Sequence, residues 1–428
     1  MISDASARSP VEQVPGTAGP KRRERLAVAM FALLLVSYVI NAMDRQLFPV
    51  LAPDVREAFG FELPQLGLLS TIFTLGMGVA GLPTGYLLAR VSRRAVALSG
   101  LVLFSATTAL TPFATGFWDM VVYRFVSGVG EAMQLTALLA IGTAYFVRHR
   151  GVAASSLNFT FGIGALIGPN LGAAILAATD WRVPFVVFGL AGFVLFVVVG
   201  LAVRPWLTEA RAGGQEVVHS EGADRITRRD PMLLAAATVL AGLAIYGYLG
   251  LYPTYLRDEL DYSATQAALA VSMYGLGALL SLFGGWLGDR FDFRNLLAGS
   301  LGLSAICGYG LFSGVDSLAA HLILSFVFGG AISGMVYANL SAGIIKSVRT
   351  QIVGQGSGLF VASLYIPAAF AGYLLGWLAV HLGWGTAALI QLSGFSVLAA
   401  ILARTARRPT SGGTADLTPA SAQERSAG

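Results

Sequence analysis

The sequence predicts an all-α membrane protein with twelve transmembrane helices arranged as two six-helix bundles. Its 428 residues are 55% hydrophobic and only 12% charged, whereas a water-soluble protein carries about 25% charged residues. Apolar blocks of about 18 residues or more recur along the whole chain, and each can cross the roughly 30 Å hydrocarbon core of a bilayer. Two segments of the first half of the chain are each similar to a segment about 200 residues later, which predicts that the twelve spans form two equivalent halves.

Hydropathy places the first six spans at 26–51, 63–88, 95–116, 119–146, 151–177 and 183–203, and the second six at 232–255, 263–288, 295–313, 317–344, 353–380 and 384–403. Several of them are long enough to tilt or to extend beyond the membrane. The predicted organisation is an N-terminal tail (1–25), a first bundle (26–204), a linker rich in Gly and charge (205–231), a second bundle (232–404) and a C-terminal tail (405–428).

Basic residues follow the even-numbered spans, at Arg90, Arg93, Arg94, Arg148, Arg150, Arg290, Arg294, Lys346 and Arg349. Both tails and the linker are basic as well. The positive-inside rule therefore predicts that the linker and both termini face the cytoplasm. All but two of the 28 basic residues are arginine, which is typical of a GC-rich bacterial genome. Together with the apolar spans, this predicts a multi-pass protein of a bacterial inner membrane.

The repeat is visible in two places. GYLLARVSRR at 85–94 matches GWLGDRFDFR at 285–294, an offset of 200 residues, and REAFGFELPQLGLL at 56–69 matches RDELDYSATQAALA at 257–270, an offset of 201. Two independent matches at nearly the same offset indicate parallel six-helix repeats.

Four charged residues lie deep inside predicted spans: Asp44 and Arg45 in the first, Arg124 and Glu131 in the fourth. Each unpaired charge near a bilayer centre costs roughly 2.5–3.5 kcal/mol. The four must therefore pair with one another or face water, and both arrangements place them inside the bundle. Helical spacing puts the polar residues of the first span on one arc of about 120°: Ser37, Tyr38, Asn41, Asp44, Arg45 and Phe48.

Two interpretations of this charged quartet remain open. It could be a structural ion-pair network that joins helices, or a binding site coupled to a proton. A carboxylate in a low dielectric takes up a proton more readily, and an arginine stays charged and can hold an anion. On the second interpretation, Asp44 and Glu131 carry the proton while Arg45 and Arg124 hold an anionic substrate.

Further polar and aromatic residues within spans are candidates for substrate binding: Tyr38, Asn41, Phe48, Gln134, Asn158, Tyr248, Tyr252, Tyr274, Asn339, Ser363 and Tyr365. For the amides and hydroxyls the alternative is a hydrogen bond between helices. For Tyr252 it is an aromatic belt at the membrane interface.

Enzymatic chemistry finds little support. The four histidines show no metal-ligand spacing, so neither a metal nor a cofactor is expected. Cys307 is the single cysteine, which excludes an intrachain disulfide. The basic residues lie between spans, so no nucleic-acid partner is expected. The partners we expect are the bilayer, a small organic anion and H⁺, and we expect a monomer.

The repeated segments at 85–94 and 285–294 resemble the cytoplasmic element of the major facilitator superfamily. The resemblance to this family covers residues 26–404. NAMDRQ at 41–46 and RFVSGVGEA at 124–132 are similar to its anion:cation symporter branch, and the Spinster-like branch shares both motifs. The resemblance implies alternating access, proton coupling at Asp44 and Glu131, and substrate or coupling contacts at Arg45 and Arg124.

The same resemblance implies a cytoplasmic gate at Gly85, Arg90, Arg94, Gly285, Asp289 and Arg290. Ala89 stands where the family usually has Asp, so the first copy of the gate is expected to be weaker. GALIGPNLGA at 164–173 resembles an element of proton antiporters, with Ala173 in place of the last Gly, although small residues also serve ordinary helix packing.

These observations predict a secondary transporter, and no enzyme. We expect proton-coupled symport of a small organic anion, which would be a sugar acid or an aromatic or aliphatic carboxylate. The alternative is a proton-coupled exporter of an amphiphile such as a lysolipid or a drug.

Overall fold

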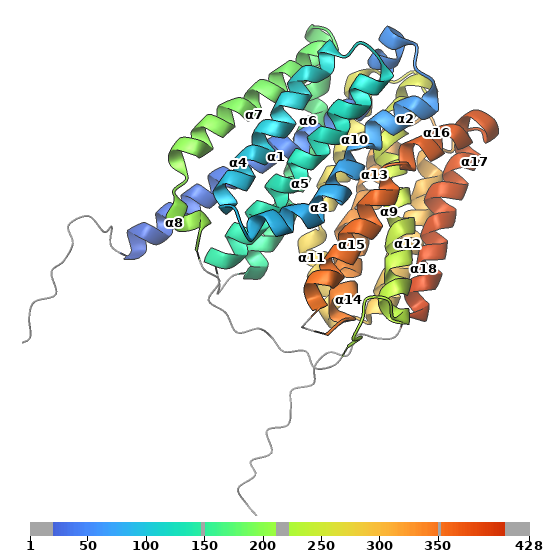
Figure 1. Ribbon diagram of the computed structural model, residues 1–428. Helices are drawn as coiled ribbons and strands as arrows, with labels where there is room; N and C mark the ends of the chain where they lie inside the picture. The colour runs from blue at the N-terminus through green and yellow to red at the C-terminus, as the bar shows by residue number, and fades with distance from the viewer. Residues whose placement is uncertain (1–19, 147–149, 211–221, 350–351, 407–428) are drawn as a thin grey trace, which may run out of the picture.

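A computed structural model describes residues 20–146, 150–210, 222–349 and 352–406, and within these ranges the chain is almost entirely helical. The only strand-like feature there is an isolated bridge between Ala223 and Val348. Figure 1 shows two bundles side by side, one drawn in blue to green and the other in yellow-green to red. The chain thus folds as twelve transmembrane helices in two six-helix bundles.

The first bundle has a helix or a helix pair for each of its six spans. The elements are α1 (Pro20–Phe59), α2 (Leu63–Thr71), α3 (Phe73–Leu88), α4 (Arg93–Leu110), the short 3₁₀ turn η1 (Thr111–Phe113), α5 (Phe117–Tyr145), α6 (Arg150–Ala178) and α7 (Arg182–Ala202). The second predicted span is divided at Ile72 into α2 and α3. Helix α1 is longer at both ends than the predicted 26–51, because it begins with the polar segment PKRRER and ends with PDVREAF, and both lie beyond the apolar stretch.

The short α8 (Pro205–Thr208) leads to the second bundle, in which four of the six spans are built from shorter segments. The elements are α9 (Arg229–Asp258), α10 (Ala264–Ala278), α11 (Ser281–Arg290), α12 (Phe293–Leu311), α13 (Leu318–Gly329), η3 (Gly330–Tyr337), α14 (Ala338–Lys346), α15 (Val353–Ala368), α16 (Ala371–Leu382), α17 (Trp384–Ala388), η5 (Leu389–Gly394) and α18 (Phe395–Thr405). The segments η3 and η5 are π-helical. Among the described residues, ten helices are long and apolar enough to cross a membrane; the two other spans are the divided pair α10–α11 and the Gly- and Ser-containing α12.

The loops α3–α4 and α11–α12 lie at one end of both bundles, which we call the basic end. At the opposite end two ion pairs join the halves: Arg56 contacts Asp258 at 2.8 Å, and Arg257 contacts Asp54 at 2.5 Å. Helices α2 and α16 also meet there through two glycines. A Cβ atom on Gly67 would lie 2.1 Å from the carbonyl oxygen of Gly372, so only hydrogen fits between these backbones.

The described parts of the linker are bound to the bundles. Glu209, which follows α8, accepts hydrogen bonds from the backbone N–H groups of Arg93 and Arg94 at the start of α4. On the other side of the linker, Ala223 bridges to the segment after α14 through Ser347 and Arg349. The linker therefore touches the basic end of each half.

Close packing of α5 on α3 leads to a stability prediction. A Cβ atom on Gly128 would lie 1.8 Å from the backbone oxygen of Phe73, and a backbone atom cannot move away as a flexible side chain can. We expect Gly128→Ala to destabilise the fold by about 1–3 kcal/mol or more, despite the higher helix propensity of alanine.

The measurement is the thermal unfolding midpoint of the purified protein in detergent. Gly200→Ala is the matched control, since Gly200 also lies in a helix and has no neighbour within 4 Å of a built Cβ atom. Equal midpoints for the two variants would contradict this packing.

Candidate functional site

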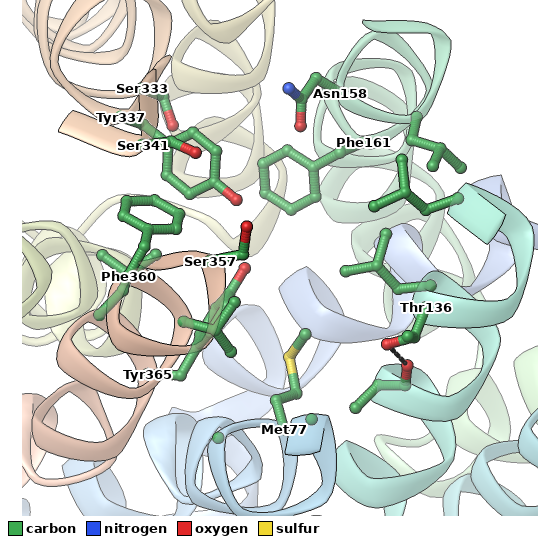
Figure 2. A pocket seen from close by; sticks show the side chains of 18 of the residues that line it. Met77, Thr136, Asn158, Phe161, Ser333, Tyr337, Ser341, Ser357, Phe360 and Tyr365 are labelled. Atoms are coloured by element: carbon green, nitrogen blue, oxygen red, sulfur yellow. Dashed lines mark hydrogen bonds between the residues drawn. The ribbon is translucent and has the colours of Figure 1, made fainter. Parts of the chain in front are cut away.

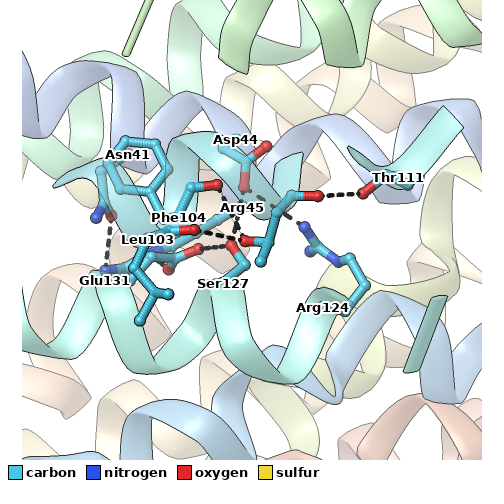
Figure 3. A network of polar contacts seen from close by, with 10 residues as sticks. Asn41, Asp44, Arg45, Leu103, Phe104, Thr111, Arg124, Ser127 and Glu131 are labelled. Atoms are coloured by element: carbon cyan, nitrogen blue, oxygen red, sulfur yellow. Dashed lines mark hydrogen bonds and ion pairs between the residues drawn. The ribbon is translucent and has the colours of Figure 1, made fainter. Parts of the chain in front are cut away.

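The four charges inside the first bundle form two crossed ion pairs between α1 and α5. Arg45 Nε lies 2.7 Å from Glu131 Oε2, and Arg124 Nη1 lies 3.5 Å from Asp44 Oδ2. The side chains are at most 4% exposed. Neighbours on α1 therefore bind partners two turns apart on α5, as Figure 3 shows. The structure brings together the four residues that the sequence singled out.

Ser127 lies between the two carboxylates. Its hydroxyl is 3.4 Å from Asp44 Oδ2 and 3.2 Å from Glu131 Oε1. A serine hydroxyl carries a single proton, so it donates to one carboxylate at a time and can accept from the other only when that group is protonated. Ser127, which the sequence analysis did not single out, thus connects the two ion pairs (Figure 3).

A chain of amides orients the Arg45 guanidinium. Arg45 donates to the Asn41 side-chain oxygen at 3.0 Å, and Asn41 donates to Gln134 at 2.9 Å. Gln134 donates in turn to the Ser37 hydroxyl at 2.9 Å. Asn41 and Gln134 were predicted to contact substrate, but they lie behind Arg45 and fix its position.

The second ion pair is loose and incompletely satisfied. Asp44 Oδ1 and the Nε and Nη2 atoms of Arg124 are buried without a hydrogen-bond partner. The guanidinium carbon of Arg124 lies 5.3 Å from the Phe48 ring centre and 5.1 Å from that of Phe73, within range of cation–π attraction. The Phe48 side chain is fully buried against this arginine. This pair keeps unused donors and an unused acceptor, which is unusual for buried charge.

A cavity of about 600 Å³ lies between the two bundles. Its wall includes Arg45 and Tyr38 from α1 and Asn158 and Phe161 from α6. It continues to Gly85 near the basic end. Arg124, Asp44 and Glu131 do not line it, so Arg45 is the member of the quartet that reaches the cavity wall.

The second bundle contributes aromatic rings and hydroxyl groups to the same cavity. Tyr274 and Tyr365 line it as the sequence predicted, together with residues that the prediction missed: Tyr246, Ser281, Ser333, Tyr337, Ser341, Ser357 and Phe360. Figure 2 shows many of these side chains across the cavity from Phe161. The four-residue spacing of Ser333, Tyr337 and Ser341 is the signal that could have revealed them, because it places polar groups on one helix face.

Four other residues that were predicted to bind substrate do not line the cavity: Tyr248, Tyr252, Asn339 and Ser363. Tyr248 and Tyr252 stack at 4.7 Å within the second bundle, and Tyr252 hydrogen-bonds His321 at 2.8 Å. Asn339 donates to two backbone carbonyls, of Gly284 and Met335, and so joins helices. Ser363 is half-buried and does not line the cavity.

The predicted gate residues at the basic end do not join the halves through the contacts described. Arg90 and Arg290 each lie over the aromatic ring four residues earlier in the chain, Tyr86 and Trp286, at 4.3 and 4.2 Å. Arg94 donates to the backbone oxygen of Gly200 in the first bundle. The surroundings of Gly285 and the side chain of Asp289 fall outside the described part of the structure, so the role of these two residues in the gate stays a prediction.

The tight pair at the cavity wall leads to a prediction about stability. Arg45→Ala leaves the buried Glu131 without its cation, and breaking a buried pair costs about 3–5 kcal/mol. We expect a lower unfolding midpoint in detergent, and recovery of most of the loss in Arg45→Met combined with Glu131→Leu, which removes both charges. Arg228→Ala, which breaks an exposed pair with Asp224, is the control and should leave the midpoint unchanged. If Arg45→Ala lowered the unfolding midpoint no more than Arg228→Ala does, the ion pair between Arg45 and Glu131 would not contribute to stability.

Comparison with known proteins agrees with this architecture. The chain is 26% identical to the 3-(3-hydroxy-phenyl)propionate transporter of Escherichia coli K12, over 89% of this chain and 93% of that protein. It is 27% identical to the probable L-galactonate transporter of the same organism, over 63% of each chain.

Its fold is similar to that of a bacterial homologue of the human lysosomal transporter Spinster in an inward-facing conformation, with a TM-score of 0.68 at 16% identity, over 90% of this chain and 95% of that one. The family model of the Major Facilitator Superfamily matches residues 34–277 and 234–426. The relatives are membrane transporters and not enzymes. The chain accordingly belongs to the major facilitator superfamily.

Proposed function

We propose that this protein is a secondary transporter that moves a small organic anion together with H⁺ by alternating access. The observation that carries the proposal is the position of Arg45, which is paired with a buried acid and also reaches the wall of a cavity between the two halves. An arginine at a cavity wall can bind a carboxylate, and the acid behind it can carry the proton.

The geometry suggests how the two events are coupled. While Glu131 is ionised, it holds Arg45 Nε at 2.7 Å. A proton that binds Glu131 removes this negative charge and releases the guanidinium to the carboxylate of the substrate. The charge at the site is then balanced by the substrate, so proton and anion bind together at lower electrostatic cost than either alone.

Asp44 supplies a second proton position. Ser127 connects its carboxylate with Glu131, and the pairing of Asp44 with Arg124 is long, at 3.5 Å. We propose that protons pass between the two acids through the Ser127 hydroxyl, while Arg124 acts on Asp44 and does not touch the substrate.

Alternating access is supported by the two ends of the molecule. The cavity reaches Gly85 and Ile345 toward the basic end, while at the opposite end the pairs Arg56–Asp258 and Arg257–Asp54 hold the halves together. By the positive-inside rule, the basic end, the linker and both termini face the cytoplasm. We further propose that the protein is a monomer in the inner membrane of a bacterial cell. The conformation is then open to the cytoplasm. The expected direction is uptake, because the proposed symport moves the anion together with H⁺ down an inward proton gradient.

The named relatives support an organic anion as the substrate. One is named for a hydroxyphenylpropionate and the other for galactonate, both of which are organic acids. An exporter of lysolipids or cationic drugs is the competing function, and the tests below distinguish it.

The first test concerns proton coupling. In Asp44→Asn and in Glu131→Gln the side chain cannot exchange a proton, while its amide oxygen still accepts a hydrogen bond from arginine. We expect each variant to fold and insert, yet to lose accumulation of organic acid in proteoliposomes under a pH gradient. Asp180→Asn, which changes an exposed acid of the α6–α7 loop, should accumulate normally. Normal accumulation by both buried variants would reject the coupling assignment.

The second test separates the two arginines. Lysine keeps the charge but loses the planar fork, so Arg45→Lys should weaken organic-acid binding by about tenfold or more, whereas Arg124→Lys should leave affinity nearly unchanged. Binding is measured as thermal stabilisation, which reaches about 2.7 kcal/mol at a hundredfold excess over Kd. Full affinity in both variants would make the quartet structural. Stabilisation by lysolipids or cationic drugs alone would favour the exporter.

A further inference from the structure

The chemistry of the cavity wall restricts the body of the substrate. Among the described residues that line the cavity, Arg45 is the only charged side chain and Asn158 the only amide. The rest of the wall is aromatic, aliphatic or hydroxyl-bearing. The single cation of the wall suits a monoanion. The hydroxyl groups lie among rings and aliphatic groups, so they can bind a few polar groups of a substrate whose body is otherwise apolar. A polyhydroxylated acid has donors and acceptors along its whole length, and each one that faces a ring or an aliphatic group without a partner costs binding free energy.

Aromatic rings surround the position next to the charge. The guanidinium carbon of Arg45 lies 5.6 Å from the ring centre of Tyr38 and 5.8 Å from that of Phe161. Tyr246 and Tyr365 line the cavity on the other half, with ring centres 6.1 Å apart. A carboxylate bound to Arg45 therefore carries its adjoining group among rings from both halves. Planar aromatic groups pack well in such surroundings, with offset or edge-to-face contacts.

A hydroxyl pair lies elsewhere in the wall. Tyr274 Oη and Ser333 Oγ are 2.8 Å apart, and both residues line the cavity. Ser333 begins the face that continues through Tyr337 and Ser341, as Figure 2 shows. Each of the two hydroxyls can donate and accept, so the pair can exchange hydrogen bonds with a substrate hydroxyl. A site that binds a hydroxyl in this way discriminates against the analogue that lacks it.

We infer that the transported anion is a hydroxyaryl monocarboxylate, held with its carboxylate at Arg45, its ring among Tyr38, Phe161 and the tyrosines of the second half, and its hydroxyl at the Tyr274–Ser333 pair. This inference rests on the proposed function of the site as an organic-anion carrier. It adds the substrate class and assigns Tyr274 and Ser333 as the residues that select for the hydroxyl group.

The test compares three acids on the full-length protein in detergent: 3-(4-hydroxyphenyl)propanoate, 3-phenylpropanoate and gluconate. We expect the hydroxyaryl acid to bind about threefold to tenfold more tightly than the aryl acid, the effect of one hydrogen bond. Gluconate should give no thermal stabilisation at the concentration that saturates the other two. Counterflow in proteoliposomes should rank the acids in the same order.

Two variants address the hydroxyl pair. Tyr274→Phe and Ser333→Ala should each bring the ratio of the Kd values of the aryl and hydroxyaryl acids toward one, because each removes one hydroxyl of the pair. Tyr248→Phe is the matched control, because Tyr248 donates to a serine hydroxyl in the same way, to Ser325 at 3.1 Å, but lies outside the cavity. This control should keep the wild-type preference.

The outcomes separate this inference from the function on which it rests. Tighter binding of gluconate that is weakened by Arg45→Lys would overturn the aryl class and leave anion transport intact. Binding of aryl acids with an unchanged preference in both Tyr274→Phe and Ser333→Ala would overturn the assignment of the hydroxyl pair. Binding of no acid, or of lysolipid alone, would reject the proposed function itself.

Discussion

The cost of placing charge in an apolar interior organises the first half of this molecule. Asp44 and Arg45 are adjacent on α1, and they are stable inside the bundle only because α5 presents a cation and an anion two turns apart. This requirement brings α1 and α5 together along their middle turns. Ser127 and Asn41 hydrogen-bond the charged groups directly, and Gln134 hydrogen-bonds Asn41.

The two ion pairs differ in length and in their distance from the cavity, as the proposed coupling requires. One is short and lies at the cavity wall, where a ligand can compete for the arginine. The other is longer, has unpartnered polar atoms and lies away from the cavity. The single Ser127 hydroxyl reaches an acid of each pair, and in the proposed mechanism it is the route by which a change of charge at the wall reaches the inner pair.

Hydropathy predicted the twelve spans and the four buried charges, because membrane insertion strongly penalises a polar or charged group in contact with lipid. The internal repeat predicted the two halves. The cavity wall of the second half was harder to predict. Helical spacing shows which residues share a face, but not which neighbour that face meets. Tyr248 and Tyr252 therefore looked like cavity residues and instead pack within their own bundle. The four-residue spacing of Ser333, Tyr337 and Ser341 places them on one helix face, but it does not show that this face meets the cavity.

The ion pairs at the end opposite the basic loops have a further consequence. Arg56 and Arg257 occupy equivalent positions in the two repeats, and each binds an aspartate of the other half. These side chains are partly exposed, from 19% to 40%, whereas the buried quartet is almost sealed from solvent. Dissolved ions screen exposed charges over about 8 Å at physiological ionic strength and reach buried pairs much less. The salinity of the medium on that side thus acts on the closure between the halves and leaves the charge balance of the inner site unaltered.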